Sequence, residues 1–169
     1  MKLSNYIFLL FPLFSLFSSC NNNEIEPLID VNLQAEREDQ IIRQYLAENN
    51  LTAERTDLGI YYIVLEEGEG TATPNNGAKV VVNYTGKVIY GRQFDSSYET
   101  NNPLEFTIGA SSVVIGFEEA VKQMKLNEKT RFFIPSRYAY GEQGRTTQDG
   151  TQIIPTLATL IFDIELERL

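Results

Sequence analysis

Four aromatic residues between residues 80 and 169 are the leading candidates for a functional site. They are Tyr84, Phe94, Tyr140 and Phe162. Rings from distant parts of a chain can wall a small apolar pocket beside a carboxylate, and here Asp95, Val113 and Val114 are candidates to complete it. Such a pocket would bind an apolar group rather than carry out acid-base chemistry. Rings in the strands of a small domain are often core residues, so the spacing alone leaves both interpretations open.

Residue types that the chain lacks exclude several kinds of catalytic site. The chain has no histidine and a single cysteine, which excludes the usual zinc sites, the Ser-His-Asp and Cys-His nucleophile systems and an internal disulfide. A carboxylate-dependent hydrolase is the remaining acid-base alternative, and the sequence gives it little support. The net charge of -9, with 14 scattered basic residues, argues against binding to nucleic acid or to an anionic membrane surface.

The first 19 residues have the pattern of an export signal. Lys2 gives a positive start, residues 6–17 form an apolar run, and small residues lead to Cys20. This run is interrupted by Pro12 and is shorter than the roughly 20 residues that span a bilayer. We therefore expect residues 1–19 to be a signal peptide that is removed.

The position of Cys20 resembles the lipobox of bacterial lipoproteins, in which the cysteine is lipidated and becomes the new N-terminus. Phe17 stands three places earlier, where that motif usually has leucine. The resemblance implies a protein anchored by lipid to a membrane of the bacterial cell envelope, on its periplasmic or surface side. The alternative is ordinary signal cleavage that leaves a free thiol at Cys20.

The next segments are expected to lie outside the main domain. Residues 20–34 are polar and acidic and are expected to form a flexible tether. Residues 35–50 are expected to form an amphipathic helix, because apolar residues from Ile41 to Leu46 recur at helical spacing. Whether this helix packs on the domain or mediates association stays open, and so does the oligomeric state.

Residues 57–169 are expected to form one domain, which suits the length of the chain. Strands are expected at residues 59–65, 79–84, 104–108, 130–134 and 160–166, with a reversal near Gly91 and a long exposed loop at 141–152. In the last strand apolar residues alternate with polar ones, so that one face of the strand is apolar. The residues of that face are Leu160, Phe162, Ile164 and Leu166.

One helix is expected inside this domain, because four apolar residues recur at intervals of three and four. They are Val114, Phe117, Val121 and Met124. Glu118 and Glu119 lie in the first turn, where the helix dipole favours negative charge. This acidic pair is therefore interpreted as stabilising the helix rather than as a catalytic dyad.

Six segments of the domain resemble, in the same order, the FKBP-type peptidyl-prolyl cis/trans isomerases. They are VNYTG (82–86), GRQFDSS (91–97), VVIGFEEAVKQM (113–124), SRYAYG (136–141), IIP (153–155) and ATLIFDIEL (158–166). The resemblance covers residues 59–169 and implies an α+β fold. In that fold a strongly twisted antiparallel sheet of about five strands wraps over one short helix, here preceded by the N-terminal helix.

The resemblance also implies a proline-binding pocket at matching positions. Its walls would be Tyr84, Phe94, Val113, Val114, Tyr140 and Phe162, with Phe117 as the floor and Asp95 at the rim. Ile153 and Ile154 would line the edge, and the backbone N–H of Ile154 would donate to a substrate carbonyl. The implied reaction requires no cofactor, metal, nucleophile or proton base.

The implied function is the isomerisation of X–Pro bonds during the folding of exported proteins. Its partners would be proline-containing client polypeptides and macrolide ligands. The alternative is a membrane-tethered module that binds proline-containing segments, or acts as a chaperone, without turnover.

The sequence departs from the family pattern at several positions. Phe117 stands where tryptophan is common, and Leu104 replaces a usual aromatic residue. Thr100 stands where an arginine often pairs with the acid that corresponds to Asp95. The loop at 141–152 is longer than in small members and lacks their histidine. These differences bear on macrolide affinity and substrate preference more than on the basic activity.

Overall fold

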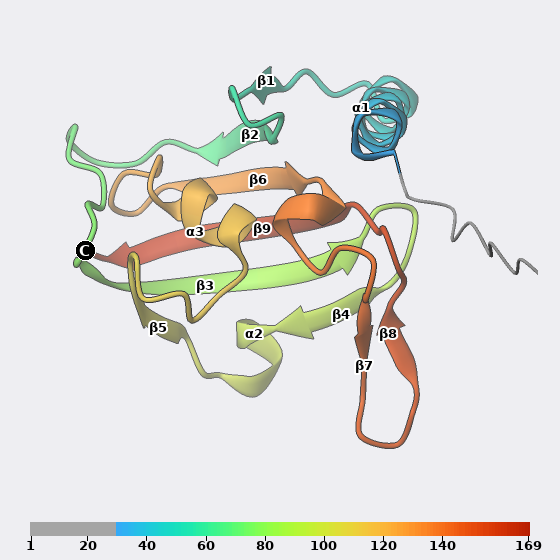
Figure 1. Ribbon diagram of the computed structural model, residues 1–169. Coiled ribbons are helices and arrows are strands. Elements are labelled where there is room, and N and C mark those ends of the chain that lie inside the picture. Colours follow the sequence, from blue (N-terminus) through green and yellow to red (C-terminus); the bar gives the residue numbers. More distant parts are fainter. Residues whose placement is uncertain (1–29) are drawn as a thin grey trace, which may run out of the picture.

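The computed structural model describes residues 30–169 (Figure 1). The expected signal peptide, Cys20 and most of the expected tether lie outside the described residues. The first elements are α1 (Val31–Glu48), β1 (Glu54–Arg55), β2 (Tyr61–Glu66), β3 (Lys79–Val88), β4 (Gln93–Ser96), α2 (Ser97–Thr100) and β5 (Leu104–Thr107). The remaining elements are α3 (Ile115–Val121), β6 (Lys129–Ile134), η1 (Ser136–Tyr138), β7 (Arg145–Thr146), β8 (Gln152–Ile154) and β9 (Leu160–Arg168).

The main sheet is antiparallel, with strand order β1-β2-β6-β9-β3-β4. Strand β5 also pairs with β3, at residues 79–82, whereas β4 pairs with residues 85–87 of the same strand. Because β4 and β5 follow each other along one edge of β3, the sheet is five strands wide over most of its area, and the two-residue β1 extends it. The structure confirms the expected α+β class, the antiparallel sheet and its short helix.

One face of the sheet packs against α3 and forms the larger hydrophobic core (Figure 1). On β9 the expected alternation is confirmed, because Leu160, Ile164 and Leu166 are fully buried and Phe162 is only 4% exposed. Phe117, Val121 and Met124 of the α3 region pack into the same core. This face positions most of the candidate site residues.

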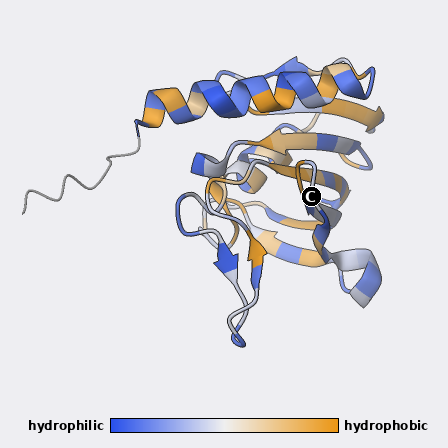
Figure 2. Cartoon of the chain, turned by 90° about the vertical axis from the view of Figure 1, so that its right-hand side faces the viewer, coloured by the Kyte–Doolittle hydropathy of each residue, from blue (hydrophilic) through white to orange (hydrophobic). Residues whose placement is uncertain are grey.

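The opposite face of the sheet carries a smaller core beneath α1 (Figure 2). Ile42 and Leu46 of the helix pack against apolar side chains of the sheet. These are Tyr61, Ile89, Phe133 and Ile161. The N-terminal helix is therefore part of the folded domain. Strand β9 is covered on both faces, by the larger core on one side and by α1, above Ile161, on the other.

Helix α1 begins four residues earlier than the sequence pattern indicates. The Asp30 side chain caps it by accepting hydrogen bonds from the backbone N–H groups of Asn32 and Leu33. Residues 31–34 are therefore helical rather than part of the tether. The folded region also begins before residue 57, because β1 pairs with β2.

Three short elements differ from the expectations. The single-turn helix α2 follows β4 directly, and a two-stranded hairpin of β7 and β8 occupies part of the segment expected as a loop. Elements this short contain too few residues to show a helical or strand period. Within residues 30–169, no helix combines the length and the apolar character needed to cross a membrane.

Candidate active site

A cavity of about 400 Å³ brings together residues from most parts of the main domain. Its lining residues are Tyr84, Phe94, Asp95, Leu104, Ser111, Ser112, Val113, Val114, Phe117, Tyr140 and Phe162. They come from β3, β4, β5, β9, α3, the segment that precedes α3 and the turn that follows η1. Eight of the ten pocket residues expected from the sequence line this one cavity.

The aromatic rings form an edge-to-face cluster centred on Phe162. The Phe162 ring centroid lies 5.2 Å from that of Phe117 and 5.7 Å from that of Phe94, with interplanar angles of 82° and 85°. Tyr84 lies 5.5 Å from Phe117 at an angle of 80°. Such contacts hold ring orientations more firmly than burial alone. The rings therefore form a rigid apolar wall.

Gly86 allows two of these rings to lie against the backbone of β3. A Cβ atom at this position would be 2.7 Å from Cε1 of Phe162 and 2.8 Å from Cζ of Phe94. These separations are too short for carbon atoms in contact, so any side chain at Gly86 would displace the rings. The glycine in the VNYTG segment is thus required by the shape of the cavity.

Tyr84 and Asp95 form one polar part of the cavity wall. The Tyr84 hydroxyl donates a hydrogen bond of 2.9 Å to Oδ2 of Asp95, and the backbone N–H of Ser96 donates one of 2.9 Å to Oδ1. Burial, together with the bond to this carboxylate, raises the pKa of Tyr84 to about 12. Tyr84 is therefore neutral at physiological pH and serves as a fixed donor.

A buried serine couples β3 to the segment that carries Asp95. The Ser97 hydroxyl accepts a hydrogen bond of 2.9 Å from the backbone N–H of Tyr84 and donates one of 2.8 Å to Asn83. It is 3% exposed. Ser97 belongs to the GRQFDSS segment, but no residue pattern in the sequence predicts this role for it.

Within residues 30–169, Asp95 has no lysine or arginine partner at ion-pair distance. At Thr100 the hydroxyl instead donates to the backbone carbonyl of Ser97 at 3.2 Å, within its own helical turn. Among the described residues, the donors that orient the acid at the cavity wall are therefore two neutral groups, the Tyr84 hydroxyl and the Ser96 backbone N–H.

The remaining expected residues, Ile153 and Ile154, do not line this cavity. Ile154 is fully buried and packs in the main core, and Ile153 packs against that core from β8. The expected role of the Ile154 backbone N–H stays a prediction. The cavity also has lining residues that were not expected there, namely Leu104, Ser111 and Ser112. Ser111 and Ser112 directly precede the apolar pair Val113 and Val114. As polar residues in a loop, they showed no pattern in the sequence that would predict a place in the cavity.

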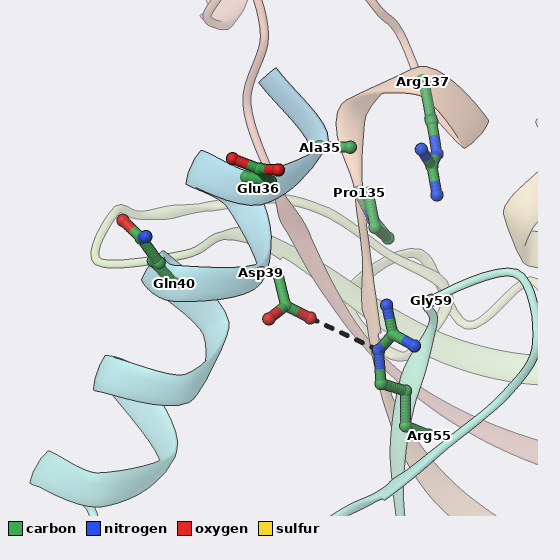
Figure 3. A pocket seen from close by; sticks show the side chains of 8 residues that line it. All are labelled: Ala35, Glu36, Asp39, Gln40, Arg55, Gly59, Pro135 and Arg137. Atoms are coloured by element: carbon green, nitrogen blue, oxygen red, sulfur yellow. Dashed lines mark ion pairs between the residues drawn. The ribbon is translucent and has the colours of Figure 1, made fainter. Parts of the chain in front are cut away.

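A second hollow, of about 320 Å³, lies between α1 and the sheet and has a different character (Figure 3). Asp39 of α1 faces Arg55 there, with 3.3 Å between its Oδ1 and Nε of the arginine. Asp39 also accepts a hydrogen bond of 2.7 Å from the Tyr61 hydroxyl. These polar contacts join α1 to β1 and β2, and no aromatic ring is among the residues that line the hollow, so it is a poor site for an apolar ring.

The ring-lined cavity can bind a compact apolar group and can hold a polar atom of that group at its rim. In the described part of the chain, no three side chains of the metal-binding types Asp, Glu, His and Cys are grouped closely enough to ligate an ion. The arrangement of the cavity therefore supports binding and orientation by apolar walls and neutral donors.

Comparison with known proteins identifies the family to which this site belongs. The family model for FKBP-type peptidyl-prolyl cis-trans isomerases matches residues 70–167. The chain is 38% identical over 109 residues to the peptidyl-prolyl cis-trans isomerase Fkbp12 of Drosophila melanogaster, covering 64% of this chain and 96% of that protein. It is 40% identical over 112 residues to the peptidyl-prolyl cis-trans isomerase FKBP1A of Xenopus laevis, covering 66% and 99%.

A solved structure extends the similarity to the arrangement of the elements. The crystal structure of FkpA from Escherichia coli is similar to 80% of this chain, with a TM-score of 0.63 and 32% sequence identity, and the match covers 60% of that protein. The family match spans β3 to β9, which carry every lining residue of the ring-lined cavity. The chain therefore belongs to the family of FKBP-type peptidyl-prolyl cis-trans isomerases and is an enzyme of that class.

Proposed function

We propose that the ring-lined cavity binds the prolyl ring of X–Pro segments in exported client proteins and accelerates their isomerisation without covalent or acid-base chemistry. The observation that carries this proposal is the edge-to-face cluster of Tyr84, Phe94, Phe117 and Phe162 around one cavity. Its volume of about 400 Å³ accommodates a proline residue with its neighbouring peptide groups.

The physics of the reaction suits an apolar cavity. Rotation about a peptide bond has a barrier of about 18–20 kcal/mol because amide resonance is lost, and uncatalysed X–Pro exchange takes tens to hundreds of seconds. The twisted transition state is less polar than the planar amide, so an apolar wall favours it over the ground state. A thousandfold acceleration requires only about 4 kcal/mol of such differential binding.

The polar groups of the site have an orienting role in this proposal. Tyr140 lines the cavity, and its hydroxyl is proposed to hold the substrate carbonyl together with the backbone N–H of Ile154. Asp95 and the neutral Tyr84 fix the rim through their mutual hydrogen bond. None of these groups needs to gain or lose a proton during the rotation.

A proline-limited refolding assay on the full chain, purified in mild detergent, tests the proposed activity. The wild type should accelerate refolding, and Phe94→Ala should reduce kcat/KM by at least about tenfold, because it removes one wall of the cavity. Tyr140→Phe should cause a smaller loss. Tyr98→Phe is a matched control, because Tyr98 does not line the cavity and its hydroxyl bonds to Glu165 on the surface.

The same assay separates the isomerase from a non-catalytic client-binding or chaperone module. Equal refolding rates with and without the protein would reject the catalytic proposal. Binding of a proline-containing peptide that persists under these conditions would then favour the module that only holds clients.

The proposed location is the bacterial cell envelope, with a lipid anchor at Cys20. This part of the proposal is supported by the sequence alone, since Cys20 precedes the described residues. Labelled fatty acid should enter the wild-type chain and not Cys20→Ser. If neither chain is labelled and both remain in the soluble fraction, the anchor is excluded and ordinary cleavage before Cys20 is supported.

Macrolide binding is proposed for the same cavity. A macrolide that occupies it should inhibit isomerisation competitively, and Phe94→Ala should weaken both inhibition and turnover. Inhibition that is not relieved by excess substrate peptide would place the ligand elsewhere.

A further inference from the structure

Glu38 of α1 is the most deeply buried acidic or basic side chain among residues 30–169, and the isomerase site does not use it. It is 1% exposed, although most carboxylates of the domain lie on the surface. Its Oε1 accepts a hydrogen bond of 2.7 Å from the backbone N–H of Ser136 and one of 3.2 Å from the Thr159 hydroxyl. Burying a carboxyl group carries a large desolvation cost, which these two hydrogen bonds to Oε1 offset in part, whereas Oε2 has no hydrogen-bond partner among residues 30–169.

Both partners of Glu38 lie at the start of segments that carry cavity residues. Ser136 begins η1, and its carbonyl accepts hydrogen bonds from the backbone N–H groups of Ala139 at 2.8 Å and Gly141 at 2.9 Å. Tyr140 lies between these two residues. The Ser136 peptide unit is therefore the centre of the turn that presents Tyr140 to the cavity.

Thr159 provides the second connection. It directly precedes β9, and Phe162 follows three residues later as the centre of the aromatic cluster. Thr159 is 2% exposed, and its backbone carbonyl accepts a hydrogen bond of 3.0 Å from the N–H of Ile89. One oxygen atom of Glu38 thus joins the turn that carries Tyr140 to the strand that carries Phe162.

Two hollows flank this turn on the side of α1. A hollow of about 480 Å³ lies between the N-terminal half of α1 and the segment 136–143, and Glu38 and Tyr140 both contribute to its lining. The hollow shown in Figure 3 lies beside the same junction, with Ala35 and Arg137 lining both. The hydrogen bonds from Ser136 and Thr159 to Glu38 help to fix the position of this turn, together with the bond of 2.8 Å from the Leu157 N–H to the Gly141 carbonyl.

We propose that Glu38 is a positioning residue for isomerisation, which sets the place of Tyr140 relative to Phe162 from a helix outside the family-matched region. Helix α1 ends at Glu48, whereas the family match begins at residue 70. The N-terminal helix thereby becomes part of the catalytic unit. The inference rests on isomerase activity at the ring-lined cavity and adds a residue on the opposite side of the sheet.

The test compares Glu38→Ala, Glu38→Gln and Ile42→Ala in the full chain, with kcat and KM measured separately on a proline-containing peptide. Glu38→Ala should lower kcat by about tenfold, the size of effect expected from a sub-ångström displacement of a group that orients substrate. Glu38→Gln should recover most of this loss, because its amide oxygen can accept the same two hydrogen bonds. Ile42→Ala is the control, because Ile42 anchors the same helix without bonding to Ser136 or Thr159.

The control separates positioning from general stability. At a temperature where all variants are folded, Ile42→Ala should retain kcat within about twofold even though it weakens the docking of α1. Equal losses of kcat in Glu38→Ala and Ile42→Ala, or no loss in either, would overturn the proposal. An inactive wild type would reject the proposed function of the cavity itself, which is a separate result.

A second variant keeps the test decisive if Glu38→Ala does not fold. Glu38→Asp retains a carboxyl group but is one methylene shorter, so one oxygen should not reach both partners. It should lower kcat and also accelerate hydrogen exchange at the Ser136 amide. Wild-type kcat together with wild-type exchange at Ser136 in Glu38→Asp would overturn the proposal.

Discussion

The Tyr84 hydroxyl and the Asp95 carboxylate are joined by a hydrogen bond of 2.9 Å at the wall of the isomerase cavity. Burial and this bond both favour the neutral phenol, and they raise the pKa of Tyr84 from 10.0 to about 12. The stabilising effect of the folded environment on neutral Tyr84 is therefore complete below pH 10 and is lost as the pH rises through about 12.

This relationship predicts that Asp95→Asn lowers the pKa of Tyr84 without returning it fully to 10. Burial is the larger cause of the shift and remains in the variant. The ring-carbon chemical shift of Tyr84, followed by NMR from pH 8 to 12.5 and assigned with Tyr84→Phe, measures the change. An identical Tyr84 titration in wild type and variant would show that the carboxylate has no influence.

Gly86→Ala is predicted to impair catalysis more than stability. The new methyl group must displace Phe94 and Phe162, which wall the cavity, and overpacking of this kind costs about 1–3 kcal/mol. We expect kcat/KM to fall by about tenfold or more in the refolding assay. Gly91→Ala is the control, because its Cβ would lie 2.9 Å from the Cβ of Val88, away from the cavity. Equal activity losses in the two variants would contradict the prediction.

The two neighbouring isoleucines of α1 are predicted to differ sharply in their contribution to stability. Ile42 is fully buried against the sheet, so Ile42→Ala should lower the free energy of unfolding by about 2–5 kcal/mol. Ile41 is 38% exposed, and Ile41→Ala should lower it by less than about 1 kcal/mol. Urea denaturation of the full chain measures both values. Similar, small losses in both variants would show that α1 is not part of the cooperative unit.

The paired residues Arg131 and Asp163 are predicted to stabilise the face of the sheet that α1 partly covers. Two hydrogen bonds of 2.6 and 2.7 Å join them across β6 and β9, and the bonds to Asp163 raise the pKa of Arg131. Asp163→Asn should lower the free energy of unfolding by about 1–2 kcal/mol. The exposed Lys79–Glu105 pair is the comparison, and Glu105→Gln should cost less than about 0.5 kcal/mol. A larger loss in Glu105→Gln would contradict this ranking.

The main sheet and its inner helix were predictable because their residues have a clear period. The apolar face of β9 and the spacing of Phe117, Val121 and Met124 each specify one buried face. The smaller core beneath α1 was not predictable from such a period. Ile161 is buried because α1, a helix far away in the sequence, docks on this face of the sheet. The docking involves contacts between residues distant in the sequence, such as that of Glu38 with Ser136.

The candidate site, too, was predictable only in part from the sequence. The pocket residues could be proposed because six segments resemble the family pattern in the same order, and eight of the ten proposed residues line the cavity. The residues that hold these rings in place gave no comparable signal. Ser97 is one serine among many, and its hydrogen bonds to Tyr84 and Asn83 exist only after the strands pair.

Val31, near the start of α1, and Tyr140, at the isomerase cavity, line the same hollow. The first described residues thus lie at the catalytic end of the molecule rather than at its far pole. Whatever precedes residue 30 therefore joins the folded domain beside the turn that carries Tyr140.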